Sequence, residues 1–379
     1  MPNKTLKIFL VISGSASSVT GSEVMFYNIL NSLEKMGHEV TLFDFKKEWA
    51  NLSSNTDRQK KTELTELILK KFNKQPIGFY NLFLSFLSDQ YVTPELYKEF
   101  KGKCLTVNWS CNSHQFNDLH RDISPVADLN TYITLDHKDL YDSVNAESYW
   151  MPMAANPNYY KNDPIKDIDI SFIGTAYYKR PYYIWRLLQS GHDIDVSGVA
   201  WNFDKNFLNF IRIYIYPTVI AFSKDSNKMH LIENNTRVNI IRLINKNWSV
   251  GGPLSDNDYT NKLSRSYMTL NFPEARNNHN FMDPNMIWGV NFRDFEAPMS
   301  GALLITQFSK ELEHFYEDGK EVISFNNEHE LLDKVNFYSR NKKSGEIIAQ
   351  AGYERAIKDH TWESRFRDLF IYLEKDFNL

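Results

Sequence analysis

LKIFLVISGSASSVTGSEVMFYNILNSLEKMGHEVTLFDF, residues 6–45, is the stretch that decides the expected fold. It opens on a continuous apolar run of β type, passes through the Ser/Gly-rich segment SGSASSVTGSE, and continues with apolar residues at helical spacing from Val24 to Leu33. Gly37 ends that helix, and residues 39–45 form the next strand. The order strand, glycine loop, helix, strand is a βαβ unit. It predicts a parallel sheet covered by helices on both faces.

The same order of elements continues through the 379 residues, more than one hydrophobic core usually organises. The Pro/Asn-rich stretch MPMAANPNYYKNDP, residues 151–164, is typical of an interdomain linker. We predict an α/β chain with two doubly wound, Rossmann-like domains facing a cleft: residues 1–155, residues 156–360, and a C-terminal helix over 361–379 that crosses back to the first domain. Expected helices cover 57–72 and 181–190, and expected strands cover 79–87, 104–109, 131–134, 148–151, 169–173, 194–197, 238–244, 268–272 and 302–306.

Charge and cysteine content limit the classes of function. The formal net charge is −4, without a long Lys/Arg block, which disfavours a nucleic-acid partner. Two cysteines, Cys104 and Cys111, are too few for a disulfide framework and indicate a reducing cytoplasm. The apolar run near the N-terminus is shorter than the ~7 residues of a secretory signal core, so a buried strand is the better interpretation.

One apolar segment does not fit the βαβ order. FLNFIRIYIYPTVIAF, residues 207–222, is interrupted by Arg212 and Pro217. It is expected to form a pair of core or interdomain helices, and the alternative is a surface that rests on a membrane or on an oligomer partner.

Two loops are candidates for contact with a ligand. In the loop after the first strand, backbone N–H groups and the start of a helix would meet an anion or an acceptor hydroxyl, although a plain tight turn is the alternative. The loop IGTAYYKRPYY, residues 173–183, adds two cations after a strand of the second domain, where open α/β sheets bind ligands and arginine can grip a phosphate. The candidates are Gly14, Ser15, Gly21 and Ser22 in the first loop, and Gly174, Thr175, Lys179 and Arg180 in the second.

A third candidate lies in NFRDFEAPMSGALLIT, residues 291–306. On a helix Arg293 and Glu296 share a face, where a surface ion pair would stabilise by only ~0.2–0.5 kcal/mol. However, Phe295 and Met299 occupy core-facing positions, Pro298 would cost a hydrogen bond in a helix interior, and the following strand leads to the edge of the expected cleft. The pair is therefore expected at the mouth of that cleft.

The second half of the chain also resembles a known family. The pattern F-R-x-x-E-A-x-x-x-G-A-L-L-I-T from Phe292, with GKEVISFNNEHELLDKV and AGYERAIKDHTWESRF, is similar to the CgeB-like spore-maturation glycosyltransferases of the GT-B superfamily. In the first half, GSEVMFYNILNSLEKMGHEVTLFD, TVNWSCNSHQF and YWMPMAANP agree more loosely.

This resemblance implies a cytoplasmic enzyme that transfers sugar from a UDP- or GDP-linked co-substrate to a glycan or other hydroxyl acceptor, without a further cofactor. The second domain would hold the donor and the first domain the acceptor. The residue that matches Glu296 typically binds the nucleotide ribose in such relatives. The residues that match Arg293, Lys179 and Arg180 meet the diphosphate.

The chain departs from the family pattern in ways that leave the stereochemistry open. Many retaining relatives carry a second glutamate at the position of Trp288, and some relatives carry aspartates where this chain has WSCNSHQF, residues 109–116. His114 is the candidate general base if the reaction inverts configuration, with Asp118 and His137 in reserve. If it retains configuration, the leaving phosphate itself can accept the proton.

Two D-x-D triplets, residues 167–169 and 193–195, resemble the metal motif of the other glycosyltransferase fold. They lie at the starts of expected strands and not at the carboxyl ends, so we interpret them as strand-edge charges and expect no metal. The alternatives to a glycan-building enzyme are a glycosyltransferase that acts on DNA and a sugar-nucleotide-binding protein without turnover.

Overall fold

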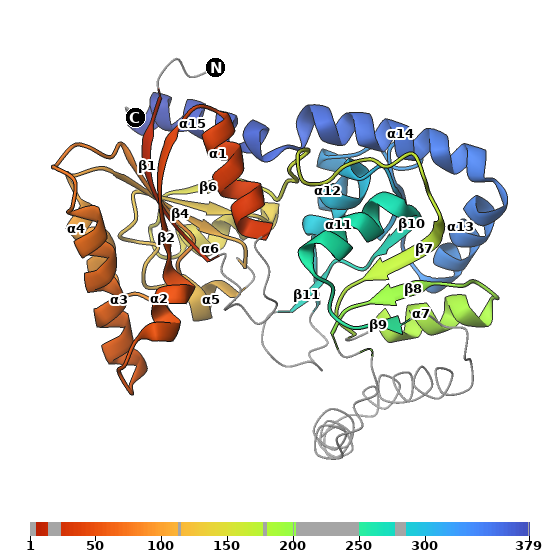
Figure 1. The fold of residues 1–379 in the computed structure, drawn as a ribbon, viewed down its shortest axis with the longest axis horizontal. Coiled ribbons are helices and arrows are strands. Elements are labelled where there is room, and N and C mark those ends of the chain that lie inside the picture. The colour runs from red at the N-terminus through yellow and green to blue at the C-terminus, as the bar shows by residue number, and fades with distance from the viewer. Residues whose placement is uncertain are drawn as a thin grey trace. The chain divides into compact units, whose positions relative to one another are not determined.

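The computed structural model describes residues 5–13, 24–112, 115–176, 180–199, 201, 250–276, 286–377 and 379 (Figure 1). The chain divides into two compact units. The first comprises Met1–Tyr159, Gly289–Phe295 and Ala356–Leu379, and the second comprises Tyr160–Trp288 and Glu296–Arg355. The apolar segment 207–222 and the strand expected at 238–244 lie outside the described residues.

The first unit is built on a six-stranded sheet in which every pair of neighbours is parallel. Its order is β2 (Glu39–Asp44), β1 (Lys7–Ile12), β3 (Leu82–Ser85), β4 (Leu105–Ser110), β5 (Leu129–Tyr132) and β6 (Ser148–Trp150). Its described α-helices before residue 289 are α1 (Asn31–Lys35), α2 (Phe45–Asn51), α3 (Asp57–Phe72), α4 (Glu95–Phe100), α5 (Phe116–Leu119) and α6 (Lys138–Asp142). A π-helical turn, Phe26–Leu30, leads into α1.

Both faces of this sheet are buried, as the apolar β1 predicted. Successive residues of a strand point to opposite faces, and every residue of β1 after Lys7 is buried. On one face Phe9 contacts Phe72 of α3, with the ring centroids 5.4 Å apart, and Phe83 stacks on Phe100 of α4 at 4.2 Å. The prediction of a parallel sheet covered on both sides is therefore confirmed.

The C-terminal helix α15 (Trp362–Phe377) packs within this first unit, as the apolar spacing of the final segment predicted. The ring of Phe370 meets His38 edge-on at 5.0 Å, and that of Trp362 meets Trp109 of β4 at 5.3 Å. The apolar spacing predicts one helical face made of Trp362, Phe366, Leu369, Phe370, Leu373 and Phe377; the first five are buried and Phe377 is partly exposed.

The second unit repeats the architecture with another six-stranded parallel sheet. Its order is β14 (Ile323–Phe325), β13 (Leu303–Gln307), β10 (Ser266–Asn271), β7 (Ile168–Ile173), β8 (Asp195–Ser197) and β9 (Val250–Gly251). The accompanying helices are α7 (Arg180–Gln189), α11 (Asp256–Arg265), α13 (Glu328–Arg340) and most of α14 (Lys342–Asp359). A separate antiparallel pair joins β11 (Glu274–Arg276) to β12 (Met286–Trp288).

The strand order places a topological switch point in each sheet. From β7 the chain continues to β8 and β9 on one side, whereas β10, β13 and β14 lie on the other side. The first sheet has the same feature between β1 and β3, because β2 lies on the opposite side of β1. Ligands of open α/β sheets bind outside the carboxyl ends of the strands at such points. Both predicted glycine loops follow a strand at a switch point: β1 in the first sheet and β7 in the second.

The helix α12 (Phe292–Met299) is the predicted helix of the stretch 291–306, and its two ends explain its limits. At the start, the Asn291 side chain accepts a hydrogen bond from the Arg293 N–H while Asp294 accepts one from the Asn291 N–H, which is a reciprocal cap. At the end, the N–H groups of residues 301 and 302 donate to the carbonyls of residues 298 and 297, the pattern of a Schellman cap with Gly301 at φ +69°. This cap turns the chain directly into β13.

Candidate functional site

The switch point of the second sheet brings together three of the four residues predicted in the loop 173–183. Gly174 and Thr175 follow β7, and Arg180 begins α7. The Arg180 guanidinium donates to the carbonyl of Phe272, just after β10, at 2.7 Å, and to that of Thr175 at 3.3 Å. The arginine therefore lies across the carboxyl ends of β7 and β10, with its side chain buried. Lys179, the fourth candidate, lies outside the described residues.

Glycines let the strand ends beside Arg180 come unusually close. Gly174 N–H donates to the Ser197 carbonyl at 2.8 Å, and Gly198 N–H donates to that of Gly252 at 3.1 Å. Trp201 Nε1 donates to the Gly174 carbonyl at 2.5 Å. A Cβ at Gly198 would lie 2.2 Å from the Gly174 carbonyl oxygen, and φ of Gly198 is +139°. Only glycine fits there, because backbone cannot move aside as a flexible side chain can.

Replacing Gly198 with alanine is expected to lower the free energy of unfolding more than the same change at Gly191. Gly191 also has positive φ, +84°, but no atom lies within 4 Å of the position of its Cβ. Gly191→Ala should cost about 1–2 kcal/mol from conformation alone. Gly198→Ala should cost about 1–3 kcal/mol more, because the strand ends must separate. Urea denaturation of both variants measures the difference, and equal losses would show that the strand ends do not depend on this close contact.

Glu296 in α12 is buried, with 2% of its surface exposed. Tyr160, at the start of the second unit, donates its hydroxyl to Glu296 Oε1 at 2.5 Å. The hydroxyl of Tyr259 on α11 donates to Oε2. Glu296 is therefore not part of an exposed surface ion pair, because its carboxylate is held inside the second unit. Arg293 is half-buried, and its backbone N–H forms part of the cap of α12.

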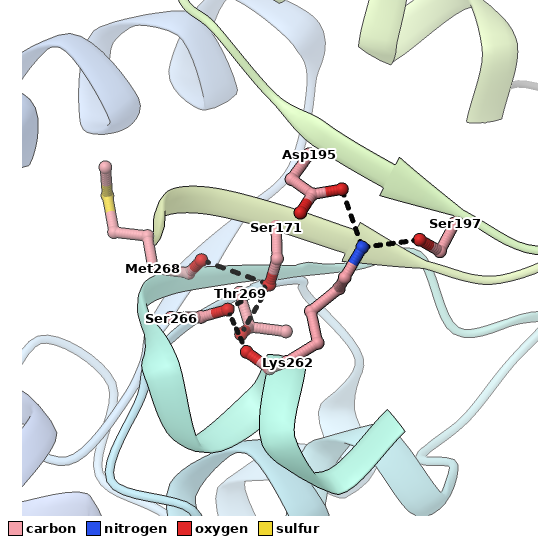
Figure 2. A network of polar contacts seen from close by, with 7 residues as sticks. All are labelled: Ser171, Asp195, Ser197, Lys262, Ser266, Met268 and Thr269. Carbon is pink, nitrogen blue, oxygen red and sulfur yellow. Dashed lines mark hydrogen bonds and ion pairs between the residues drawn. The ribbon is translucent and has the colours of Figure 1, made fainter. Parts of the chain in front are cut away.

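The helix α11, which carries Tyr259, is fixed to the sheet by a polar network (Figure 2). Lys262 extends from α11 to β8, where its Nζ donates to Asp195 Oδ1 and to Ser197 Oγ, each at 2.6 Å. Ser266, at the start of β10, donates its hydroxyl to the Lys262 carbonyl at 2.5 Å, and its Oγ is also within hydrogen-bond distance of Ser171 Oγ of β7, at 2.8 Å. Because Lys262 and Tyr259 are three residues apart on one helix, fixing the lysine also orients the tyrosine.

Lys166 links α11 to α12 at their C-terminal ends. Its ammonium group donates to the carbonyls of Ser264 at 2.6 Å and Ser300 at 3.0 Å, where the negative ends of helix dipoles favour a cation. Burial lowers the pKa of Lys166 to about 8. The lysine and the Tyr259–Glu296 hydrogen bond connect the same two helices at separate points.

The D-x-D aspartates lie beside cations of the second unit. Asp167 pairs with Arg265, Asp169 with Lys342 at 2.5 Å, and Asp195 with Lys262 at 2.6 Å. These pairs fit the interpretation of the triplets as strand-edge charges. In the part of the chain that the structure describes, no group of three or more His, Cys, Asp or Glu side chains is arranged to hold a metal ion.

The segment of the candidate general base continues from β4. His114 lies outside the described residues, as do Gly14, Ser15, Gly21 and Ser22 of the first loop. Of the two reserve residues, Asp118 is exposed on α5. His137 is 8% exposed, and burial lowers the pKa of its imidazole, which is therefore neutral at pH 7. The identity of the base stays a prediction.

Two tyrosines of this site, Tyr160 and Tyr259, were not among the residues predicted from the sequence. They lie 136 and 37 residues from Glu296 along the chain, and no local motif marks them. Gly198 could have been predicted from the sequence as part of this site, because it follows the second strand of the second domain as Gly174 follows the first.

A comparison with known protein families covers the part of the chain that contains α11 and α12. Residues 226–370 match a family model described as glycosyl transferase-like. The match covers less than half of the chain and includes α11, α12 and α13. No curated protein matches the sequence significantly.

Solved structures match over nearly the full length at low sequence identity. Sucrose-phosphate synthase from Thermosynechococcus elongatus has a TM-score of 0.61 at 10% identity, over 98% of this chain and 99% of that chain. HepE from Anabaena in complex with UDP and glucose has a TM-score of 0.58 at 11% identity, over 98% and 100%. A glycosyltransferase from Rickettsia africae has a TM-score of 0.58 at 13% identity, over 99% and 100%. The expected fold class, GT-B with two Rossmann-like domains, is therefore confirmed.

No described helix combines the length and the apolar character needed to cross a membrane. This observation covers only the residues that the structure describes.

Proposed function

We propose that this chain is a glycosyltransferase that moves a sugar from a nucleoside diphosphate to a hydroxyl acceptor. The observation that carries the proposal is the glycosyl transferase-like match of residues 226–370, because that segment contains Glu296 and the helix of its partner Tyr259. The GT-B fold supports it, as does HepE, a structural neighbour solved with UDP and with UDP-glucose. UDP is the first donor nucleotide to test, and GDP is the second.

The proposed donor site uses anion and hydroxyl chemistry at the switch point of the second sheet. Arg180, Lys179 and Arg293 would meet the diphosphate, with Gly174 and Thr175 beside it at the end of β7. Glu296 would accept hydrogen bonds from the ribose hydroxyls. Fixed cations stabilise the negative charge that develops on the diphosphate as the bond from the sugar C1 to the phosphate oxygen breaks.

The acceptor oxygen forms the new bond to C1, and its proton goes to a base. In an inverting reaction His114 is our candidate, and in a retaining reaction the departing phosphate takes the proton. We propose that the cations suffice to neutralise the diphosphate, so that EDTA leaves turnover unchanged. We propose a glycan as the acceptor and the cytoplasm as the compartment. We also propose that the chain belongs to the CgeB-like glycosyltransferases. Residues 207–222 are the candidate for peripheral membrane contact.

A thermal-shift panel followed by a hydrolysis assay tests the proposal. UDP, GDP, dTDP and CMP sugars are added to the full chain, and a ligand that binds only the folded state raises Tm by mass action. We expect a UDP or GDP sugar to raise Tm and to be hydrolysed slowly without an acceptor. If no nucleotide raises Tm, the donor site is wrong. Binding without hydrolysis or transfer would favour a sugar-nucleotide-binding protein, and steeply salt-dependent DNA binding would favour a DNA-modifying enzyme.

A further inference from the structure

The loop after β3, residues 86–88, begins at the switch point of the first sheet, between the carboxyl ends of β1 and β4. The Phe86 N–H donates to the Val11 carbonyl of β1 at 2.9 Å. On the other side, the ring of Phe86 contacts that of Trp109 in β4, with the centroids 4.5 Å apart. The first predicted glycine loop follows β1, and the segment of the candidate base follows β4. The loop after β3 is therefore the middle one of three at the edge where open α/β sheets bind ligands.

The side chain of Asn108, in β4, holds this loop. Its Oδ1 accepts a hydrogen bond from the Leu87 N–H at 3.0 Å, and its Nδ2 donates to the Leu87 carbonyl at 3.1 Å. The residue opposite Asn108 in the sheet is Ser85, the last residue of β3. A side-chain amide has a donor and an acceptor in one plane, so it can pair with both backbone groups of one residue as a neighbouring strand does. Asn108 therefore continues the pairing of β3 and β4 beyond the end of β3.

Asn108 is itself fixed by other buried polar side chains. Only 1% of its surface is exposed. Ser85 donates its hydroxyl to Asn108 Oδ1 at 2.8 Å, and the hydroxyl of Tyr97, on α4, lies 2.8 Å from Ser85 Oγ. Polar groups are costly to bury, and the middle strands of a parallel sheet are usually apolar. A hydrogen-bonded network in such a place favours one arrangement of its members, so it gives the loop a defined position that apolar packing alone would not.

We infer that Asn108 is a positioning residue for the acceptor, which holds the loop 86–88 so that the loop orients the acceptor hydroxyl beside the segment that follows β4. This inference rests on the proposed function and deepens it. Asn108 is buried and acts through the loop, in which Phe86 is half-buried while Leu87 and Ser88 are buried. Its contribution therefore concerns the acceptor, and binding of the donor nucleotide by the second unit does not depend on it.

Asn130→Ala is the matched control. Asn130 lies in the neighbouring strand β5 with 1% of its surface exposed, and its Nδ2 donates to the carbonyls of Ser124 at 2.9 Å and Glu147 at 3.1 Å. It therefore matches Asn108 in residue type, in burial and in having two hydrogen bonds to backbone groups. Ser124 precedes β5 and Glu147 precedes β6, so these bonds lie at the amino ends of the strands, on the edge opposite the three loops.

The test compares transfer to an added acceptor with hydrolysis of the same donor. The full chain and its variants receive the UDP or GDP sugar that raises Tm, with glycerol or methyl glucoside as the probe acceptor. We expect Asn108→Ala to lower the ratio of transfer to hydrolysis at least about tenfold, because a misplaced reactant can lose about a hundredfold in rate. The rate of hydrolysis and the Kd of the nucleotide should change less than about twofold, since water is small enough to react without the loop.

A milder variant covers the case in which Asn108→Ala does not fold. Ser85→Ala removes one hydrogen bond to Asn108 and keeps the amide itself. It should lower the same ratio by about two- to fivefold, the effect of one neutral hydrogen bond. Asn130→Ala should lower Tm and leave the ratio unchanged. A Tm measured for each variant separates general destabilisation from a specific loss of transfer.

The outcomes separate failure of the inference from failure of the proposed function. If the unaltered chain binds no sugar nucleotide, both fail. If it transfers to a probe and the folded Asn108 and Ser85 variants keep its ratio of transfer to hydrolysis, only the inference fails. Equal losses in Asn108→Ala and Asn130→Ala would show that Asn108 is structural. Hydrolysis by the unaltered chain without transfer to either probe would also overturn the inference, because its loop would then orient no hydroxyl acceptor.

Discussion

Replacing Glu296 with alanine is expected to weaken the binding of UDP at least about a hundredfold. In the proposed site this carboxylate accepts hydrogen bonds from two ribose hydroxyls, and each hydrogen bond to a charged group contributes about 1.5–3 kcal/mol. A loss of about 1.4 kcal/mol corresponds to a factor of ten in Kd, so two such bonds exceed a factor of one hundred. Calorimetric titration of UDP into both proteins measures the change.

The same substitution is expected to destabilise the second unit, because it leaves the hydroxyls of Tyr160 and Tyr259 without this acceptor in a buried place. Tm must therefore be measured together with Kd. Glu296→Gln keeps an acceptor of similar shape and should recover much of Tm while still binding UDP weakly, since a neutral amide is the poorer acceptor. Glu346→Ala on the exposed side of α14 is the matched control and should change neither quantity. Wild-type affinity in a folded Glu296→Ala protein would remove Glu296 from the donor site.

Buried parallel strands made most of the fold predictable from the sequence. Because both faces of such strands are covered, they appear as nearly continuous apolar runs, as in β1 after Lys7. Helix α3 has the expected limits, residues 57–72, because Thr56 accepts from the Gln59 N–H at its start and Asn73 ends it. The strand expected at 131–134 begins two residues earlier, as β5 (Leu129–Tyr132), because its sequence LNTY has no apolar run to mark its limits.

Short strands were the elements hardest to predict from the sequence. β9 has two residues and β14 has three, too few for any periodicity to be measured. Their place in the sheet depends on pairing with β8 and β13, which are distant in sequence. Such elements are defined by tertiary contacts and not by local pattern.

The candidate site was predictable only in part for the same reason. Gly174, Thr175 and Arg180 could be placed because they follow a strand directly, and strand ends meet at one edge of a parallel sheet. The charges of α12 were expected at the mouth of the cleft, and the sequence did not indicate that Glu296 is buried and held by two tyrosines. Its three-residue spacing from Arg293 is identical in a surface pair and in a buried site, so the pattern alone could not separate the two.

Replacing His114 with alanine is expected to lower kcat by a factor of about a hundred to ten thousand while the Kd of the donor changes little. General base catalysis by one positioned side chain contributes about that much, and the base contacts the acceptor hydroxyl, not the nucleotide. Its segment follows the carboxyl end of β4 in the first unit, the part of the chain proposed to hold the acceptor. Single-turnover transfer from a UDP sugar measures the chemical step directly.

The pH profile distinguishes His114 from the reserve candidates. An imidazole with an ordinary pKa near 6.5 must be neutral to accept a proton, so kcat should fall as the pH drops below about 6.5. That limb should disappear in His114→Ala, whereas Asp118→Asn and His137→Gln should retain both the limb and most of the activity. Asp118 is exposed on α5, so its substitution should have little effect on folding. Unchanged kcat in His114→Ala would favour proton transfer to the leaving phosphate, and loss of kcat in Asp118→Asn alone would move the base to that carboxylate.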